Sequence, residues 1–205
     1  MIKEIKGAIS SCLSLYYRIL RPGFTFQGRA YRYYFHKHNK TWRNERAVEL
    51  PIVLGMVKEN GGRMLEVGNV LSHYVTMNHD VVDKYERADG VINEDIVGYS
   101  PKKKYDLVVC ISTLEHIGFS PPEELEPAKP ARAVESMKKM LAKNGKMVIT
   151  FPPGYNPHLD GLVDSGKIRF SEMHCFKRTS FLNTWKEAEW SEVRQKRGLA
   201  IGVVA

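Results

Sequence analysis

The sequence predicts an α/β fold built on a mostly parallel sheet, and three observations support this prediction. Short apolar runs alternate with helical and loop segments from about residue 63 onward. The run at residues 105–111 is almost continuously apolar, which is typical of a parallel strand buried on both faces. Residues 191–197 and 199–204 are expected to be two strands joined near Gly198, which predicts an antiparallel hairpin. This order indicates an α/β protein with an antiparallel finish.

The N-terminal part is expected to form two helices. Apolar residues recur near helical spacing over residues 2–20, which predicts an amphipathic helix. Arg21-Pro22-Gly23 ends it, and a loop or short extended region follows to about Thr41. A second helix is expected from its cap Asn44 through Asn60, because Gly61-Gly62 follows.

Strands and helices are then expected to alternate. The Pro- and Glu-rich residues 120–130 predict a loop, and residues 131–143 a helix that Asn144-Gly145 closes. A further helix is expected at residues 179–188, after a long polar loop. The strands expected before the terminal hairpin are residues 63–68, 80–83, 91–92, 105–111 and 147–151.

Charge and aromatic residues are concentrated at the N-terminus. Residues 1–50 hold ten Lys and Arg against three Asp and Glu, so they carry +7 of the net charge of +8. Such a segment suits stacking on nucleic acid bases or contact with an anionic membrane surface. We favour the simpler interpretation, in which the aromatics pack on the main domain and the charges stay solvated, so nucleic acid is not an expected partner. We expect a basic, aromatic-rich helix and arm at residues 1–44 and one domain at residues 45–205.

The cysteines and the apolar segments bear on the compartment. Cys12, Cys110 and Cys175 are far apart and odd in number, which predicts neither a disulfide framework nor a structural zinc site and indicates a reducing compartment. No stretch approaches the ~20 apolar residues of a spanning helix, and no convincing signal peptide is recognised. We therefore expect a cytoplasmic protein without a transmembrane segment. Peripheral membrane contact through residues 1–40 remains open.

Acidic and glycine residues follow neighbouring predicted strands. The first strand ends in Glu66-Val67-Gly68, and the next ends at Asp83. The carboxyl ends of neighbouring parallel strands face a common crevice, where a glycine turn leaves backbone N–H groups and a carboxylate pointing at a ligand. The pattern is typical of a nucleoside-binding site. Dinucleotide-dependent redox chemistry is disfavoured, because its Gly-x-Gly-x-x-Gly motif is missing.

Four stretches in this order resemble the class I S-adenosylmethionine-dependent methyltransferases over roughly residues 45–205. The resemblance implies a Rossmann-like, mostly parallel seven-stranded sheet with a C-terminal antiparallel strand. It also implies S-adenosyl-L-methionine as cofactor and a small-molecule or glycan acceptor. The alternative is a non-catalytic relative that keeps the fold as a binding or scaffold protein. The stretches are Leu65–Gly68, Val81–Asp83, Asn93–Ile96, and Tyr105–Val109 continuing through Leu114-Glu115-His116-Ile117, which is the most specific.

The resemblance also implies which residues bind the cofactor. A carboxylate suits the ribose because it accepts hydrogen bonds from both hydroxyls. Asp83 is expected in this role, with Glu86 as the alternative. Around the methionine and adenine parts, the expected residues are Glu66, Gly68, Asn69, Lys84, Asp95, Ile96 and Ser112.

The loop after the first strand departs from the family's three alternating glycines. Val70 and Ser72 stand at the second and third glycine positions. A valine there would block close approach of the backbone to the cofactor, and β-branched residues resist positive φ. Asn69 is expected to supply the left-handed turn instead. The short interval from Gly68 to Asp83 leaves room for one or two helical turns at most.

His116 is the expected general base. Methyl transfer is an in-line displacement, so the protein positions the acceptor and removes its proton where the acceptor is a hydroxyl or amine. An imidazole just past a strand's carboxyl end suits that task, although this segment equally suits a helix cap. No metal is expected, because no second cluster pairs with the His36–His38 or His174–Cys175 segments. The acceptor residues expected are Glu115, Tyr155, His158, His174 and Lys177.

Overall fold

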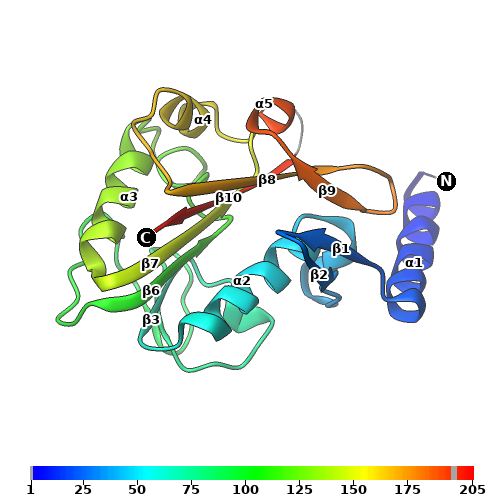
Figure 1. Cartoon of the computed structure of the whole chain (residues 1–205), viewed down its shortest axis with the longest axis horizontal. Helices are drawn as coiled ribbons and strands as arrows, with labels where there is room; N and C mark the ends of the chain where they lie inside the picture. The colour runs from blue at the N-terminus through cyan, green and yellow to red at the C-terminus, as the bar shows by residue number, and fades with distance from the viewer. Residues whose placement is uncertain (1, 195–197) are drawn as a thin grey trace.

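An eight-stranded sheet runs through the molecule in the computed structural model (Figure 1), which describes the backbone of residues 2–194 and 198–205 and the side chains from residue 11 within them. Its strands are β3 (Met64–Val67), β4 (Asp80–Val82), β5 (Val91–Ile92), β6 (Tyr105–Ile111), β7 (Leu141–Phe151), β8 (Glu172–Arg178), β9 (Trp185–Ala188) and β10 (Gly198–Val204). Their order is β5-β4-β3-β6-β7-β10-β8-β9. The first five are parallel, and β10 lies antiparallel to both β7 and β8. The α/β prediction is confirmed, with β9 as an additional edge strand.

Helices cover both faces of this sheet (Figure 1). Helices α3 (Lys129–Met140), α4 (Pro157–Asp164) and α5 (Trp190–Val193) lie on one side, and α2 (Arg46–Asn60) lies on the other with the N-terminal elements. These are α1 (Ile2–Leu20), the hairpin of β1 (Gly23–Phe26) and β2 (Arg29–Arg32), and the 3-10 helix η1 (His38–Arg43).

Because β6 is covered on both faces, its sequence is apolar except at the exposed Asp106. Leu107 and Val109 pack into the core with α2, whereas Val108 and Cys110 pack into the core with α3. Successive side chains of a strand point to opposite faces, so a strand covered on both sides buries all of them. This central strand fixes the edge at which the parallel strands end.

The aromatics of the N-terminal arm pack inward, as predicted. Phe24 and Phe26 are 8% and 2% exposed, and their rings lie 5.8 and 5.5 Å from that of Phe176 on β8. Tyr33 accepts a hydrogen bond from the backbone N–H of Trp185 at 2.7 Å. The arm therefore joins the core on the α2 side of the sheet, while the domain boundary near residue 45 stays a prediction.

Three predicted elements of the C-terminal half were wrong. The helix predicted to reach residue 143 ends at Met140, because Leu141 is extended and pairs with Tyr105. Residues 185–188 form strand β9 rather than a helix, since pairing with β8 overrides local propensity. The predicted terminal hairpin is also replaced: residues 190–193 are helical, residues 195–197 lie outside the described part, and β10 inserts between β7 and β8.

The connection from β3 to β4 is as short as predicted. Its helix, η2 (Leu71–His73), is one turn of 3-10 helix.

At the start of α2, the side chain of Asn44 accepts a hydrogen bond from the N–H of Arg46. Within the described residues, no helix combines the length and the apolar character needed to cross a bilayer.

Candidate active site

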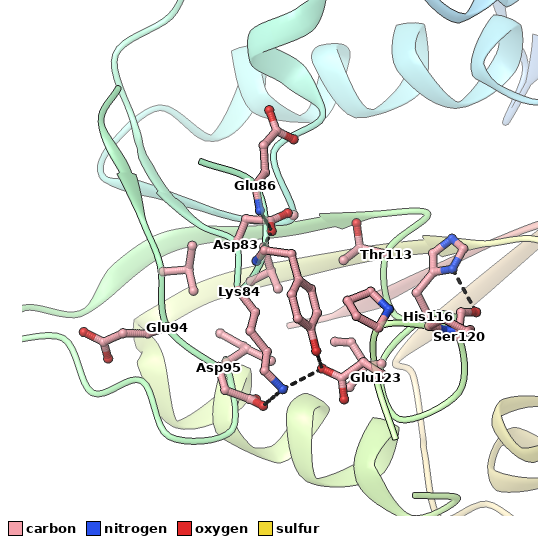
Figure 2. Close-up of a pocket in the computed structure, with 17 residues that line it drawn as sticks. Asp83, Lys84, Glu86, Glu94, Asp95, Thr113, His116, Ser120 and Glu123 are labelled. Atoms are coloured by element: carbon pink, nitrogen blue, oxygen red, sulfur yellow. Dashed lines mark hydrogen bonds and ion pairs between the residues drawn. The ribbon is translucent and has the colours of Figure 1, made fainter. Parts of the chain in front are cut away.

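A pocket of about 480 Å³ opens beyond the carboxyl ends of β3, β4 and β6 (Figure 2). Parallel strands end together at this edge, and ligands of open α/β sheets bind there. Its walls carry five carboxylates and one lysine beside apolar side chains, a lining that suits a cationic nucleoside. The residues that line it are Val67, Gly68, Val82, Asp83, Lys84, Tyr85, Glu86, Glu94, Asp95, Ile96, Thr113, His116, Ile117, Ser120, Pro121, Pro122 and Glu123.

The glycine loop leaves this pocket open. Gly68 itself takes the left-handed conformation, with φ of 84°, so the assignment of that turn to Asn69 was wrong. Val70 has φ of −103° and packs against the core on the α2 side. It is not among the residues that line the pocket, and the predicted obstruction does not occur.

Glu66 lies beneath the loop rather than in the pocket, which corrects its assignment to the methionine part. It is fully buried, and its Oε1 accepts hydrogen bonds from the N–H groups of Val70 and Leu71 at 2.9 and 2.7 Å. Its Oε2 lies 2.8 Å from Nε2 of His79. Burial disfavours the charged imidazole, but this carboxylate outweighs it and raises the pKa of His79. Glu66 therefore holds the loop in shape.

Asp83 and Glu86, the two candidates for the carboxylate that binds the ribose, make different contacts. Asp83 Oδ1 accepts hydrogen bonds from the N–H groups of Tyr85 and Glu86, both at 2.8 Å, and Oδ2 accepts one from the N–H of Asn69 at 3.3 Å. These bonds fix the turn after β4. Glu86 uses Oε1 to accept from Nδ2 of Asn69 at 2.6 Å and also lines the pocket. Asn69 itself is buried and does not line the pocket, which corrects its assignment to cofactor contact.

Four charged side chains meet at the far end of the pocket. Nζ of Lys84 lies 2.8 Å from Glu123 and 3.1 Å from Asp95, and Nζ of Lys129 lies 2.6 and 2.8 Å from the same two acids. Figure 2 shows Lys84 between the two carboxylates. Burial acts to raise both carboxyl pKa values, but the hydrogen bonds from Lys129 and Lys84 dominate and lower the pKa of Asp95 and of Glu123 to about 2. Ile96 beside them is buried and lines the pocket, as predicted.

Ser112 turns away from the pocket, which corrects its assignment to the cofactor. Its φ of 38° reverses the chain after β6, and its hydroxyl donates to Oε1 of Glu49 on α2 at 2.6 Å. Glu49 is fully buried and pairs with Arg46 at 2.5 Å. Thr113, the next residue, lines the pocket instead.

His116 lies on the rim of the pocket. Its Nδ1 lies 3.2 Å from Oγ of Ser120, and its ring meets that of Tyr155 edge-on at 5.0 Å. Burial, and secondly the positive charge of Arg46, lower the pKa of His116. The imidazole is therefore neutral near pH 7 and able to accept a proton. Tyr155 is 46% exposed beside it, so both side chains are available to an acceptor.

The other predicted acceptor residues lie in different places. Glu115 is 2% exposed and does not line the pocket; burial raises its pKa well above the usual range. His158 packs edge-on to Phe119, next to Tyr155 at the rim. His174 and Lys177 are on β8, where His174 contacts Phe26 and Lys177 pairs with Glu192. The structure thus groups Tyr155 and His158 with His116 at the rim and leaves His174 and Lys177 on β8. Glu115 is buried beside the imidazole, with its Oε1 3.9 Å from Nε2 of His116.

Sequence reasoning missed Thr113, Ser120 and Glu123. Thr113 has a signal, since it is the second residue after β6, at the carboxyl edge of the sheet. Ser120 and Glu123 have none, because the loop that carries them reaches the pocket only through contacts distant in sequence, such as Lys84 to Glu123. Within the described residues, no group of three or more His, Cys, Asp or Glu side chains has an arrangement that suits a metal ion.

Comparisons with known proteins agree with this architecture. Residues 34–201 match the family model of the Methyltransferase domain. No curated protein sequence matches the chain. The N-methyltransferase NodS from Bradyrhizobium japonicum WM9, solved with S-adenosyl-L-homocysteine, is 14% identical, with a TM-score of 0.52 over 78% of this chain and 85% of that one. The sugar N-methyltransferase KedS8 from Streptoalloteichus sp ATCC 53650 is 17% identical, with a TM-score of 0.43 over 77% and 87%.

The fold, with its pocket at the carboxyl edge, defines a class I S-adenosylmethionine-dependent methyltransferase. The chain belongs to the Methyltransferase domain family, because the family model matches well over half of its length. It is an enzyme, and its cofactor is S-adenosyl-L-methionine.

Proposed function

We propose that this enzyme transfers a methyl group from S-adenosyl-L-methionine to a hydroxyl or amine of a small-molecule or glycan acceptor. The observation that carries the proposal is the position of His116, a base on the rim of the same pocket that Gly68 and Asp95 line. A base at this place removes the acceptor's proton while the acceptor faces the cofactor.

We assign the cofactor to the pocket by the chemistry of its walls. The hydrogen bond from Asn69 uses Oε1 of Glu86. We therefore choose Glu86 as the residue that accepts hydrogen bonds from the ribose hydroxyls through its Oε2. Ile96 and Val82 offer apolar surface to the adenine, and Asp95 closes that end. Gly68 and Thr113 border the methionine part. The bound cofactor supplies an electrophilic methyl group on a sulfonium, whose positive charge suits the acidic lining.

We assign the acceptor to the rim formed by His116, Ser120 and Tyr155. The Tyr155 hydroxyl lies 3.3 Å from Oγ of Ser120, which in turn lies within reach of His116. This chain of polar groups holds the imidazole in place and offers hydrogen bonds to a polyhydroxylated acceptor. Tyr155 and Phe119 add aromatic faces that suit the apolar side of a sugar ring.

Binding and turnover test the proposal separately. Isothermal titration with S-adenosyl-L-methionine and S-adenosyl-L-homocysteine measures the cofactor site, and undetectable binding at millimolar ligand would overturn the assignment of the pocket. Transfer of a labelled methyl group to a panel of amino and hydroxy sugars then measures the acceptor site. Cofactor binding without transfer to any acceptor of the panel would contradict the proposed acceptor class.

We place this reaction in the cytoplasm. The free thiols of Cys110 and Cys175 are buried and Cys12 is exposed, an arrangement that suits a reducing compartment. Fractionation of cells that express a tagged chain tests this, and recovery from an extracytoplasmic fraction would contradict it.

A further inference from the structure

Helix α1 presents an apolar stripe that no described part of the chain covers. Leu13 and Tyr17 face the body of the protein and are 4% and 2% exposed. Cys12, Leu15 and Ile19 are spaced three and four residues apart, so they share a different face of the helix. Leu15 and Ile19 are 56% and 67% exposed, and Cys12 is exposed as well. Exposed apolar surface of this kind marks an interaction site.

The surroundings of this stripe are basic. Residues 11–44 contain seven Lys and Arg and no Asp or Glu. Arg18 precedes Ile19 on the helix, Arg21 follows its last turn, and both are exposed. Of the other bases, Arg29 is paired with Glu59 at 2.6 Å. A partner that meets this face therefore meets apolar side chains beside uncompensated positive charge, which favours an anionic partner.

The burial of the aromatic side chains in the N-terminal arm distinguishes between two anionic partners, nucleic acid and a lipid bilayer. Stacking on nucleic acid bases needs exposed aromatic faces. Phe24, Phe26 and Tyr33 are at most 8% exposed and are used in the core. An exposed aliphatic stripe flanked by arginines is instead the pattern of a helix that lies in a membrane interface.

A second exposed apolar side chain lies near the same helix. The backbone carbonyl of Asn183 accepts a hydrogen bond from the Tyr17 hydroxyl at 2.9 Å, so the loop between β8 and β9 contacts α1. Figure 1 shows this loop reaching toward α1. Phe181 in this loop is 77% exposed. Phenylalanine is among the side chains that membrane-surface segments bury at the boundary between headgroups and acyl chains.

We propose that α1 docks the enzyme on an anionic lipid bilayer. Leu15 and Ile19 enter the boundary between headgroups and acyl chains, and Arg18 and Arg21 contact the phosphates. Apolar burial and lipid electrostatics then act together, and each is needed for stable attachment. The proposal rests on α1 and its charges, and it is independent of the methyl acceptor.

Vesicle co-sedimentation of the full chain tests this proposal. We expect binding to vesicles of phosphatidylcholine mixed with phosphatidylglycerol, little binding to phosphatidylcholine alone, and weaker binding at high salt. The double variant Leu15→Gln/Ile19→Gln is expected to reduce partitioning by about tenfold or more. Arg18→Gln/Arg21→Gln is expected to weaken binding and to flatten its salt dependence. Leu125→Gln, at a leucine 65% exposed in a different loop, is the matched control and should bind like the parent chain.

Three results would overturn the proposal. The first is no binding to the anionic vesicles by a chain with an intact circular dichroism spectrum. The second is equal binding by the parent chain and Leu15→Gln/Ile19→Gln. The third is concentration-dependent self-association without lipid that this double variant abolishes, which would assign the stripe to a second copy of the chain.

Discussion

Thr113 occupies the space directly above Gly68. A Cβ at position 68 would lie 2.2 Å from Oγ1 of Thr113, and Gly68 has φ of 84°. Position 68 thus needs glycine for two independent reasons, a left-handed backbone and a close approach between the ends of β3 and β6. The single glycine that this loop keeps from the family pattern is the one at which the structure has no room for a side chain.

Gly68→Ala is expected to weaken the cofactor site more than a conformationally matched variant. Gly90 has φ of 78°, but a Cβ there would meet nothing within 4 Å, so Gly90→Ala carries only the backbone strain of about 1–2 kcal/mol. We expect Gly68→Ala to lower the free energy of unfolding further and to weaken S-adenosyl-L-homocysteine binding about tenfold or more. Urea unfolding and titration calorimetry measure the two effects. Equal affinities of both variants would contradict the role of the Thr113 contact.

His116→Gln is expected to lower kcat by about 10²–10⁴-fold, because the acceptor's proton loses its base. The affinity for S-adenosyl-L-homocysteine should change little. His174→Gln is the matched control, since His174 lies on β8 beside Phe26 and away from the pocket lining. A loss of activity in His174→Gln equal to that in His116→Gln would indicate that His174 belongs to the acceptor site.

The pH dependence of kcat should carry the signature of His116. Its pKa is lowered by burial and by Arg46, and the base must be neutral to accept a proton. The rate is therefore expected to stay level through neutral pH and to fall only as acid protonates the imidazole, below the usual range of histidine. An acid limb that appears above that range would exclude His116 as the titrating group.

Substitution of Glu86 is expected to affect cofactor affinity first, and substitution of Asp83 is expected to affect stability first. Glu86→Gln removes a charged acceptor from the ribose and should weaken S-adenosyl-L-homocysteine binding by roughly tenfold, a cost of about 1.4 kcal/mol. Asp83→Asn disturbs the turn that three backbone N–H groups fix, so the free energy of unfolding should fall first. Calorimetry and urea unfolding of both variants separate these effects. A stable Asp83→Asn protein with the larger loss of affinity would restore Asp83 as the ribose ligand.

The lysine–acid cluster predicts how stability depends on pH. The pKa of Glu123 is about 2 in the folded protein against an ordinary value of 4.5, and that of Asp95 is about 2 against 3.8. Folded values below unfolded ones give a contribution that is complete above about pH 5 and is lost as the pH falls toward about 2. Because both carboxylates are partly exposed, solvent screening reduces each contribution to on the order of 1–2 kcal/mol.

Urea unfolding at neutral and acidic pH tests this contribution. Glu123→Gln should lower the free energy of unfolding at neutral pH and flatten its fall in acid. Glu124→Gln, at the exposed neighbouring position, is the control and should retain the steep fall. A Glu123→Gln protein with the parent's pH dependence would show that this cluster contributes little.

Much of the fold and part of the site could be predicted from local sequence. The apolar run of β6 and the glycine at position 68 are local signals, because burial on both faces and a left-handed turn each restrict residue type directly. The position of His116 follows from the end of β6. The β9 and α5 segments could not be predicted, since their state depends on pairing with β8 and on packing across the sheet.

The sequence by itself determined the α/β class, the edge at which the site forms and the basic character of the N-terminal arm. The tertiary structure alone decided which neighbouring side chain faces the ligand. The positive φ of Ser112 sends its hydroxyl to Glu49 and leaves Thr113 in the pocket, and Glu123 arrives from a loop 39 residues beyond Lys84. Side-chain direction at a chain reversal and contacts between distant segments are set by packing, and no short stretch of sequence encodes them.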